Sequence, residues 1–418
     1  MSVAACRKDL DTTAPKVTIL LPGAGTTLSI PDTLTVRVRV EDDRGLKSVW
    51  MALTDVNGVP VAPAVLVPVD GSSATIERDI PVLDERITSG MYTLTVRADD
   101  ETNTGSAFRP VNVQAAPLRL RAVFLTTPFG GTPATITRID SLGGQSTFLT
   151  MADVNGGTAV GHTRHVVLAG GQSAPMLGVP TWSGAGNWQV ANQNALAQPF
   201  FRHLRLDPTD GRVYFGTNDG FIRGFLGSGS QTFTAQAQAG FLSIATAVVG
   251  DRLMVAEQAI SLPERRMVSY TYTSGIPLAW HPLDLDVRHL DKRTSSTALV
   301  FGDRAGEGVI QERDVMQGGV FEMRVFSEGG IRFVARLNGD TWAIALPDKV
   351  VRFHYPTNTV VTLAQGISAT WLAFEEATGR IYAAQDATVH LIDPGTGQQV
   401  GTISAPHPIG AVLPLLNR

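Results

Sequence analysis

Apolar and polar residues alternate strictly in two segments near the start of the chain. Residues 34–41 read Leu-Thr-Val-Arg-Val-Arg-Val-Glu, and residues 92–98 read Tyr-Thr-Leu-Thr-Val-Arg-Ala. A period of two is typical of a β-strand with one buried and one exposed face. Between them lies Asp55-Val56-Asn57-Gly58, whose Asn-Gly pair is typical of a hairpin turn. Short strands separated by turns over about 100 residues predict a β-sandwich for residues 16–116.

The rest of the chain contains an internal repeat. Residues 211–215 read Gly-Arg-Val-Tyr-Phe, and residues 379–383 read Gly-Arg-Ile-Tyr-Ala, 168 residues further on. This distance equals four periods of about 42 residues, and four-stranded propeller blades repeat every ~40–45 residues. Copies at this spacing can be traced through the remainder of the chain. Their register points are Arg121, His165, Arg212, Arg252, Thr297, Thr341 and Arg380.

The end of the chain explains how the repeat closes. Residues 409–413, Ile-Gly-Ala-Val-Leu, form an apolar strand left over after the seventh copy. The first copy lacks an equivalent strand, so the C-terminal strand is expected to complete it and remove an exposed sheet edge. The sequence thus predicts an all-β protein with a seven-bladed β-propeller over residues 117–418, closed by the C-terminal strand. Residues 1–15 are interpreted as an N-terminal tether.

Cys6 is the only cysteine, so an intrachain disulfide is impossible. The segment Val3-Ala4-Ala5-Cys6 resembles the lipobox of bacterial lipoproteins, in which the cysteine is acylated. The charged run at residues 7–11 resembles the export signal of surface-exposed lipoproteins in some Gram-negative bacteria. This resemblance implies an outer-membrane lipoprotein at the cell surface or on the periplasmic face, held to the membrane through its lipid anchor only. The alternative is an ordinary free thiol.

The predicted sandwich resembles the Ig-like modules of bacterial surface proteins over residues 40–49 and 96–103. Such modules act as spacers or adhesion units. If residues 34–41 and 92–98 are strands B and F, the loops that follow them lie at the same end of the sandwich. Carboxylates open both loops and are candidate Ca²⁺ ligands; they are Asp42, Asp43, Asp99 and Asp100. The alternative is that these side chains only bind the backbone of their own turns.

The propeller repeat resembles the quinoprotein-like and YVTN-type repeats. The resemblance is carried by the Gly-Arg-(Val/Ile)-Tyr motifs and by Asp393-Pro394-Gly395-Thr396-Gly397 in the last copy. These families include pyrroloquinoline-quinone dehydrogenases and non-catalytic scaffold lipoproteins of the outer membrane. The tryptophan that docks blades in quinone enzymes is missing from the last hairpin, where Gln398-Gln399-Val400 stands.

One turn in each copy is expected to line a binding face. This turn lies about seven residues after the register point and joins the second and third strands. The residues found there are Phe129, Gln172, Asp219, Glu257, Asp303 with Arg304, Asp348 and Asp386. Five of the seven turns carry a carboxylate, and their summed field favours a cationic partner. The alternative is that Asp is simply common in turns.

Composition and motifs narrow the function further. The net charge is −4, from 34 basic and 38 acidic residues, so nucleic-acid binding is not expected. The sequence has no Gly-x-Ser-x-Gly or His-Glu-x-x-His motif. The sequence as a whole favours a non-enzymatic cell-envelope lipoprotein. Its propeller, carried on an Ig-like spacer, would bind or scaffold an envelope protein or a glycan. The alternative is a propeller enzyme, such as a lyase, a hydrolase or a quinone-dependent dehydrogenase. Apart from a calcium ion, no cofactor is expected.

Overall fold

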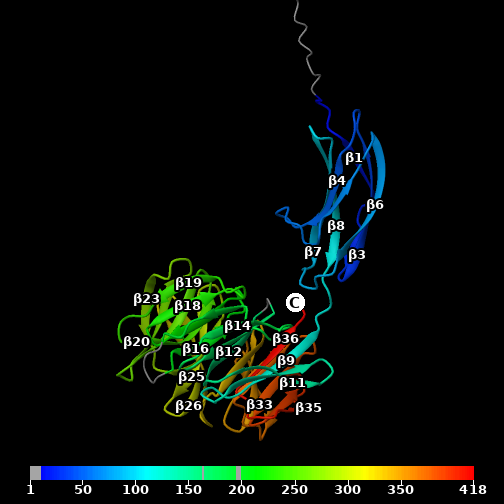
Figure 1. The fold of residues 1–418 in the computed structure, drawn as a ribbon. Helices are drawn as coiled ribbons and strands as arrows, with labels where there is room; N and C mark the ends of the chain where they lie inside the picture. Colours follow the sequence, from blue (N-terminus) through cyan, green and yellow to red (C-terminus); the bar gives the residue numbers. More distant parts are fainter. Residues whose placement is uncertain (1–10, 162–163, 194–198) are drawn as a thin grey trace, which may run out of the picture. The chain divides into compact units, whose positions relative to one another are not determined.

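The structure is a computed structural model that describes residues 11–161, 164–193 and 199–418 (Figure 1). Cys6, the predicted lipidation site, lies outside the described residues. The chain divides into two compact units, one running to Leu118 and including Asn417 and Arg418, the other spanning Arg119–Leu416. In the described ranges the regular elements are all β-strands. None of the described residues forms a helix that could cross a membrane.

The first unit consists of two β-sheets around one apolar core. The three-stranded sheet has the order β1 (Lys16–Leu21), β3 (Asp32–Glu41) and β6 (Ser73–Val82). The five-stranded sheet has the order β2 (Thr27–Ser29), β8 (Thr104–Gln114), β7 (Gly90–Asp99), β4 (Ser48–Thr54) and β5 (Val65–Pro68). Alternate residues of β3 and β7, such as Val36 and Val96, are fully buried in a cluster shared by both sheets. The strands predicted at residues 34–41 and 92–98 are therefore confirmed.

The second unit contains seven four-stranded sheets in its described residues. The first has the order β36 (Ala411–Leu416), β9 (Leu120–Thr126), β10 (Ala134–Asp140) and β11 (Gln145–Met151). The second consists of β12 (Asn155–Gly161), β13 (His165–Gly170), β14 (Met176–Pro180) and β15 (Trp188–Val190). The third consists of β16 (Phe201–Leu206), β17 (Val213–Thr217), β18 (Phe221–Phe225) and β19 (Gln231–Gln236).

The remaining four sheets follow the same order. The fourth consists of β20 (Phe241–Val249), β21 (Arg252–Ala259), β22 (Arg265–Thr271) and β23 (Pro277–Pro282). The fifth consists of β24 (Asp286–Lys292), β25 (Thr297–Arg304), β26 (Glu307–Asp314) and β27 (Val320–Phe326). The sixth consists of β28 (Phe333–Asn338), β29 (Thr341–Ala345), β30 (Lys349–His354) and β31 (Thr359–Gln365). The seventh consists of β32 (Trp371–Glu375), β33 (Arg380–Gln385), β34 (Thr388–Ile392) and β35 (Gln399–Ser404).

The register points of the repeat coincide with these sheets. Each of them lies within one residue of the start of the second strand, counted from the innermost strand of its sheet. The repeated glycine has a structural reason, because Gly211 and Gly379 adopt φ angles of +67° and +66° in the turn before that strand. A residue with a Cβ atom is strained in this conformation, so the turn favours glycine.

Buried apolar clusters join each sheet to its neighbour. Six clusters connect consecutive sheets along the chain; one of them, for example, holds Phe301 of the fifth sheet and Trp342 of the sixth. A seventh cluster holds Val412 and Val123 of the first sheet together with Val389 of the seventh. Because the last sheet packs on the first in the same way as every other pair, the sheets form a closed ring.

The C-terminal strand is the innermost strand of the first sheet. β36 pairs antiparallel with β9, with Leu413 opposite Phe124 (Figure 1). The prediction that this strand completes the first copy is therefore confirmed. The two residues after it belong to the first unit, although the sequence placed them with the repeats. There Asn417 donates hydrogen bonds to Glu85 Oε2 at 2.8 Å and to the Pro117 carbonyl at 3.1 Å.

Candidate functional site

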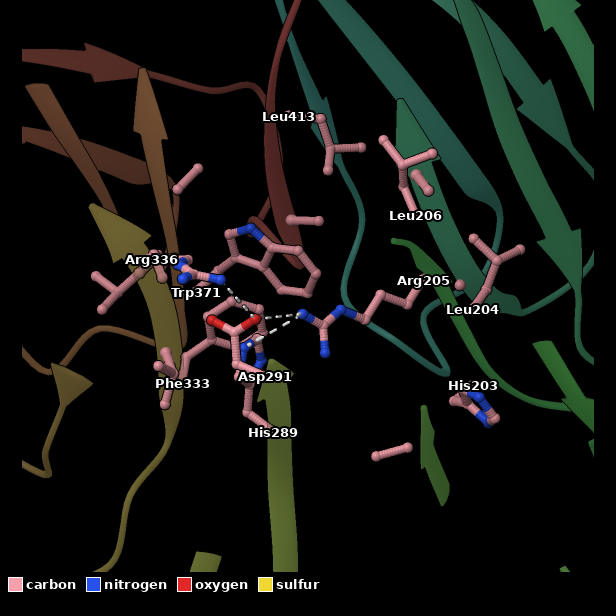
Figure 2. A pocket seen from close by; sticks show the side chains of 18 of the residues that line it. His203, Leu204, Arg205, Leu206, His289, Asp291, Phe333, Arg336, Trp371 and Leu413 are labelled. Carbon is pink, nitrogen blue, oxygen red and sulfur yellow. Dashed lines mark hydrogen bonds and ion pairs between the residues drawn. The ribbon is translucent and has the colours of Figure 1, made fainter. Parts of the chain in front are cut away.

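A cavity of about 1170 Å³ lies at the centre of the ring of sheets. All seven innermost strands contribute to its wall; they are β36, β12, β16, β20, β24, β28 and β32. Figure 2 shows part of this wall. The central cavity is therefore a product of the closed ring rather than of any single repeat. Its volume is enough for a small organic ligand.

The lining of the central cavity is rich in basic side chains. Six basic residues line it, namely Arg202, Arg205, Arg288, Lys292, Arg293 and Arg336. Two carboxylates, Asp291 and Glu376, line it as well. The wall of the cavity thus carries more positive than negative charge, in contrast to the acidic face that the sequence suggested.

Asp291 is the carboxylate at the centre of this arrangement, and only 3% of its surface is exposed. Its Oδ2 atom accepts a hydrogen bond of 2.7 Å from the indole Nε1 of Trp342, a fully buried residue of the neighbouring sheet. Its Oδ1 atom accepts one of 2.9 Å from the backbone N–H of Lys292. These contacts fix the orientation of the carboxylate, because a buried acceptor is costly to leave without a donor.

Arg205 reaches toward Asp291 from the third sheet (Figure 2). Its guanidinium nitrogen lies 3.9 Å from Asp291 Oδ1, which is a long ion pair. It donates hydrogen bonds to two main-chain carbonyls, at 3.1 Å to Thr246 and also to Leu290, and its Nη2 atom lies 3.5 Å from His289 Nε2. Arg205 therefore connects the third, fourth and fifth sheets through their innermost strands.

Arg336 approaches Asp291 from the sixth sheet, on the other side of the carboxylate (Figure 2). The distance between its guanidinium nitrogen and Asp291 Oδ1 is 3.5 Å. Like Arg205, it donates its shorter hydrogen bonds to main-chain carbonyls, those of Asn338 at 2.9 Å and Gly339 at 3.0 Å. One carboxylate is thus shared by two guanidinium groups.

The two histidines of the central cavity add no positive charge at neutral pH. Burial lowers the pKa of His203 to about 4, and the positive charges of Arg205 and Arg202 act in the same direction. Burial also lowers the pKa of His289 well below its ordinary value, again helped by Arg205 and by Arg336. Both imidazoles are therefore neutral at pH 7.

Two aromatic rings form an apolar part of the wall. The rings of Phe333 and Trp371 are 4.0 Å apart between centroids, with an angle of 31° between their planes. The indole Nε1 of Trp371 donates a hydrogen bond of 3.1 Å to the Val412 carbonyl of β36, which holds the ring in place. A charged cluster and a flat apolar surface therefore lie in the same cavity (Figure 2).

Five residues predicted for the binding face lie where the sequence placed them, in turns between the second and third strands. They are Phe129, Gln172, Asp219, Asp348 and Asp386. Phe129 also lines the central cavity and is 61% exposed. Asp219 is not a free charge, because it forms an ion pair with Arg223 at 3.2 Å. Asp348 accepts a hydrogen bond of 2.9 Å from Gln365.

The placement of Glu257 in a turn is wrong. Glu257 lies within β21, is 0% exposed, and forms hydrogen bonds of 2.8 and 2.7 Å with Arg266. The Tyr270 hydroxyl donates a third hydrogen bond to it at 2.5 Å. The physical reason is strand length. β21 has eight residues and continues to Ala259, whereas β17 has five and ends at Thr217, so Glu257, five residues after its register point, is still within the strand.

Asp303 and Arg304 also differ from the prediction, since they are the last two residues of β25. Asp303 pairs with Arg288 at 2.9 Å, and Arg304 pairs with Asp284 at 2.8 Å and Glu322 at 2.7 Å. Several acidic side chains of the predicted face are therefore paired with cations. This weakens the summed negative field that favoured a cationic partner.

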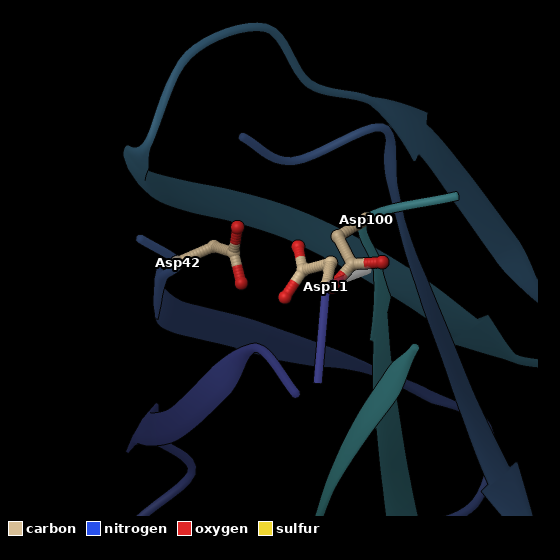
Figure 3. A group of neighbouring side chains, drawn as sticks. All are labelled: Asp11, Asp42 and Asp100. Atoms are coloured by element: carbon tan, nitrogen blue, oxygen red, sulfur yellow. The ribbon is translucent and has the colours of Figure 1, made fainter. Parts of the chain in front are cut away.

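The first unit brings two of the four candidate calcium ligands together. One carboxylate oxygen each from Asp42, Asp100 and Asp11 lies within 4.8 Å of the others (Figure 3). Asp43 and Asp99 are not members of this group, and Asp99 accepts a hydrogen bond of 3.0 Å from the Thr104 hydroxyl. Asp11 was not singled out by the sequence, because it precedes the sandwich.

These carboxylates also bind the backbone of their own loops, which is the alternative that the sequence left open. Asp42 Oδ2 accepts backbone hydrogen bonds from Arg44 at 2.9 Å and Gly45 at 2.7 Å. Asp100 Oδ1 accepts two of 2.6 Å from Thr102 and Asn103. Three carboxylates are fewer than the six to eight oxygen ligands that Ca²⁺ takes. The calcium site stays a prediction.

The sequence analysis did not single out the basic residues of the central cavity. A signal for them is nevertheless present. The tripeptide Arg-His-Leu occurs at residues 202–204 and again at residues 288–290, 86 residues later. This spacing is two periods of 43, so both copies fall on innermost strands, β16 and β24.

No protein-family model and no curated protein sequence matches the chain. Among solved structures, the WD40 repeats of RRP9 align with a TM-score of 0.50 and 12% identity, over 62% of this chain and 83% of theirs. A quinoprotein alcohol dehydrogenase-like protein from Bacteroides thetaiotaomicron aligns with a TM-score of 0.48 and 12% identity, over 96% and 99% of the two chains. BamB from Moraxella catarrhalis aligns with a TM-score of 0.41 and 14% identity, over 62% and 90%.

Sequence identities this low support a shared fold and nothing about function. Of the three similarities, only that to the WD40 repeats, with a TM-score of 0.50, supports the fold. It agrees with the closed ring of four-stranded sheets, each of which packs on the next through a buried apolar cluster. Four-stranded sheets repeated around a central channel define one all-β architecture. The second unit of this chain is a β-propeller.

Proposed function

We propose that this chain is a non-enzymatic lipoprotein of the cell envelope, in which a seven-bladed propeller on an Ig-like sandwich binds or scaffolds a protein or glycan partner. The seven four-stranded sheets of the described second unit support seven blades. The pairing of β36 with β9 supports closure by the C-terminal strand. The lipid anchor at Cys6 rests on the lipobox resemblance alone.

The Ig-like assignment of the first unit has structural support. In an Ig domain the loops that follow strands B and F lie at the same end of the sandwich. The corresponding strands here are β3 and β7, which belong to different sheets. Asp42 follows β3, Asp100 follows β7, and their carboxylates lie close together (Figure 3).

The state of Asp291 favours binding over catalysis. This carboxylate already accepts hydrogen bonds from Trp342 and from the Lys292 backbone, and two guanidinium groups flank it. A general base needs a lone pair directed at the substrate proton, whereas this carboxylate holds neighbouring blades in position. The enzyme alternative is tested by titrating the protein with pyrroloquinoline quinone and Ca²⁺. A saturable spectral change would favour a quinone-dependent dehydrogenase.

Partner capture from detergent-solubilised membranes tests the scaffold proposal. Phe129 is exposed in the turn between β9 and β10, and Leu142, 95% exposed, lies in the turn between β10 and β11 at the other end of the same sheet. Phe129→Asp and Leu142→Asp are therefore matched variants on opposite ends of one blade. We expect wild type and Leu142→Asp to capture one partner in stoichiometric amounts, and Phe129→Asp to capture at least about tenfold less.

Two outcomes would contradict this proposal. Equal capture by both variants would exclude the face that carries Phe129. Failure of the wild-type protein to capture any stoichiometric partner would exclude the scaffold role itself. A glycan partner is tested in the same format, with envelope polysaccharide immobilised in place of membrane protein.

A further inference from the structure

We propose that the central cavity of the propeller binds a small organic anion, namely a carboxylate carried on an apolar or aromatic body. The oxyanion would contact the guanidinium groups of Arg205 and Arg336 that flank Asp291, and the body would lie against Phe333 and Trp371. This inference goes beyond the proposed scaffold function, because it concerns a ligand inside the ring rather than a partner on its face.

The first argument is the charge of the cavity. Arg205 and Arg336 share the single carboxylate of Asp291 at 3.9 and 3.5 Å, so neither forms a close ion pair with it. Arg202 and Lys292 also line the cavity, and no carboxylate of the described chain lies within 4.0 Å of their charged groups. The cavity wall therefore keeps an excess of positive charge that the protein does not neutralise.

The second argument is the environment of that charge. Cations that are partly withdrawn from water are stabilised by an anion, because desolvation removes the water that would otherwise screen them. The buried histidines do not alter the balance, since their pKa values are lowered and both are neutral at pH 7. A guanidinium group presents a planar set of donors that matches a carboxylate or a phosphate.

The third argument is the shape and polarity of the rest of the wall. Phe333 and Trp371 present adjacent rings, and Leu204 and Leu413 also line the cavity (Figure 2). An aromatic or apolar body in contact with these side chains would remove apolar surface from water. A volume of about 1170 Å³ accommodates such a body together with its carboxylate.

The test compares 1-naphthoate with its neutral isostere 1-naphthamide, each titrated calorimetrically into the full chain. We expect naphthoate to bind at least about tenfold more tightly than naphthamide, and its affinity to fall as sodium chloride is raised. Arg205→Met should lower the naphthoate affinity by at least about tenfold. Arg324→Met, at an exposed position of β27 outside the cavity, is the matched control and should leave the affinity unchanged.

A second variant covers the case in which Arg205→Met disturbs the fold, since Arg205 also binds carbonyls of neighbouring blades. The Lys292 ammonium has no ion-pair or hydrogen-bond partner among the described residues, so Lys292→Met should keep the wild-type melting curve. It should lower the naphthoate affinity by about threefold, because it removes one unit of positive charge from the cavity wall.

Three results would overturn the proposal. They are equal affinities for naphthoate and naphthamide, no saturable naphthoate binding up to about 5 mM, and unchanged binding in folded Arg205→Met and Lys292→Met variants. Inorganic phosphate as a competitor distinguishes the sources of the oxyanion. Competition would extend the site to phosphate-bearing ligands, and its absence would restrict it to carboxylates. None of these measurements depends on partner capture, so either proposal can fail while the other stands.

Discussion

The indole of Trp342 in the sixth blade donates a hydrogen bond of 2.7 Å to the carboxylate of Asp291 in the fifth blade. Both residues are buried, at 0% and 3% exposure. The same carboxylate is shared by Arg205 and Arg336. One side chain on an innermost strand thus contacts residues from two other blades, the third and the sixth.

Replacing Asp291 tests this relationship. Asp291→Ala removes the acceptor of the Trp342 indole and the shared counter-charge, so we expect the free energy of unfolding of the propeller to fall by about 3 kcal/mol. Asp291→Asn keeps an acceptor oxygen for the indole and should cost less. Urea denaturation followed by fluorescence measures both changes. A loss below about 1 kcal/mol for the alanine variant would show that the network does not stabilise the ring.

His203 should make the propeller less stable in mild acid. Burial, with the nearby Arg205 and Arg202 charges, lowers the pKa of His203 from 6.5 to about 4 in the folded protein. Below pH 6.5 the unfolded chain therefore binds this proton while the folded chain does not, and stability falls. Between pH 7 and pH 5 this residue should account for a loss of about 2 kcal/mol. His203→Gln should lack that part of the loss in urea denaturation at the two pH values.

The control for this experiment is His354→Gln, a histidine of β30 that is not among the residues lining the cavity. It should keep the acid sensitivity of the wild-type protein. If His203→Gln loses stability between pH 7 and pH 5 as steeply as wild type does, the acid sensitivity arises elsewhere.

Deleting residues 409–418 should prevent the propeller from folding as a closed ring. The deletion removes β36, so the first blade keeps three strands and the buried contacts of Val412 with Val123 and Val389 are lost. We expect aggregation or the loss of cooperative thermal unfolding, because an unpaired strand edge and apolar surface become exposed. Deletion of residues 417–418 alone is the control, since it leaves β36 intact. A wild-type melting curve for the longer deletion would refute this role for the strand.

Replacing the single cysteine tests the lipid anchor. When the chain is expressed behind a complete signal peptide, wild type should fractionate with membranes, and Cys6→Ser should be released into the soluble fraction. The physical reason is that acyl chains contribute about 0.8 kcal/mol per buried methylene, and the variant cannot carry them. Metabolic labelling with a palmitate analogue provides a second readout. Membrane association of the variant at the wild-type level would mean that the lipoprotein interpretation is wrong.

Local patterns in the sequence were sufficient for much of the fold. Alternation identifies β3 because each inward-facing residue, such as Val36 or Val38, is buried in one core. The Gly-Arg-Val-Tyr motif marks the repeat because Gly211 occupies a turn with positive φ that glycine adopts without strain. Both signals depend only on residues close together in the chain, and so they can be read without coordinates.

The site depends on residues that are distant in the chain, which explains why it was missed. Arg205, Asp291 and Arg336 come from three different blades, and only the closure of the ring brings them together. Glu257 shows a related error, because the distance from the register point to the next turn depends on strand length, which differs from sheet to sheet. The pairing of acidic side chains with cations, as for Asp303 with Arg288, likewise cannot be read from the sequence.

The position of β36 also constrains when the protein can fold during its synthesis. Blade one takes β9, β10 and β11 from the start of the propeller and β36 from residues 411–416. A nascent chain on the ribosome can form the sandwich early, but the ring stays open until its last strand has left the exit tunnel. Until then the cluster around Val123 lacks one side, and the exposed strand edge of β9 is a site for aggregation. That edge therefore stays open to aggregation throughout translation of the seven four-stranded sheets of the described second unit.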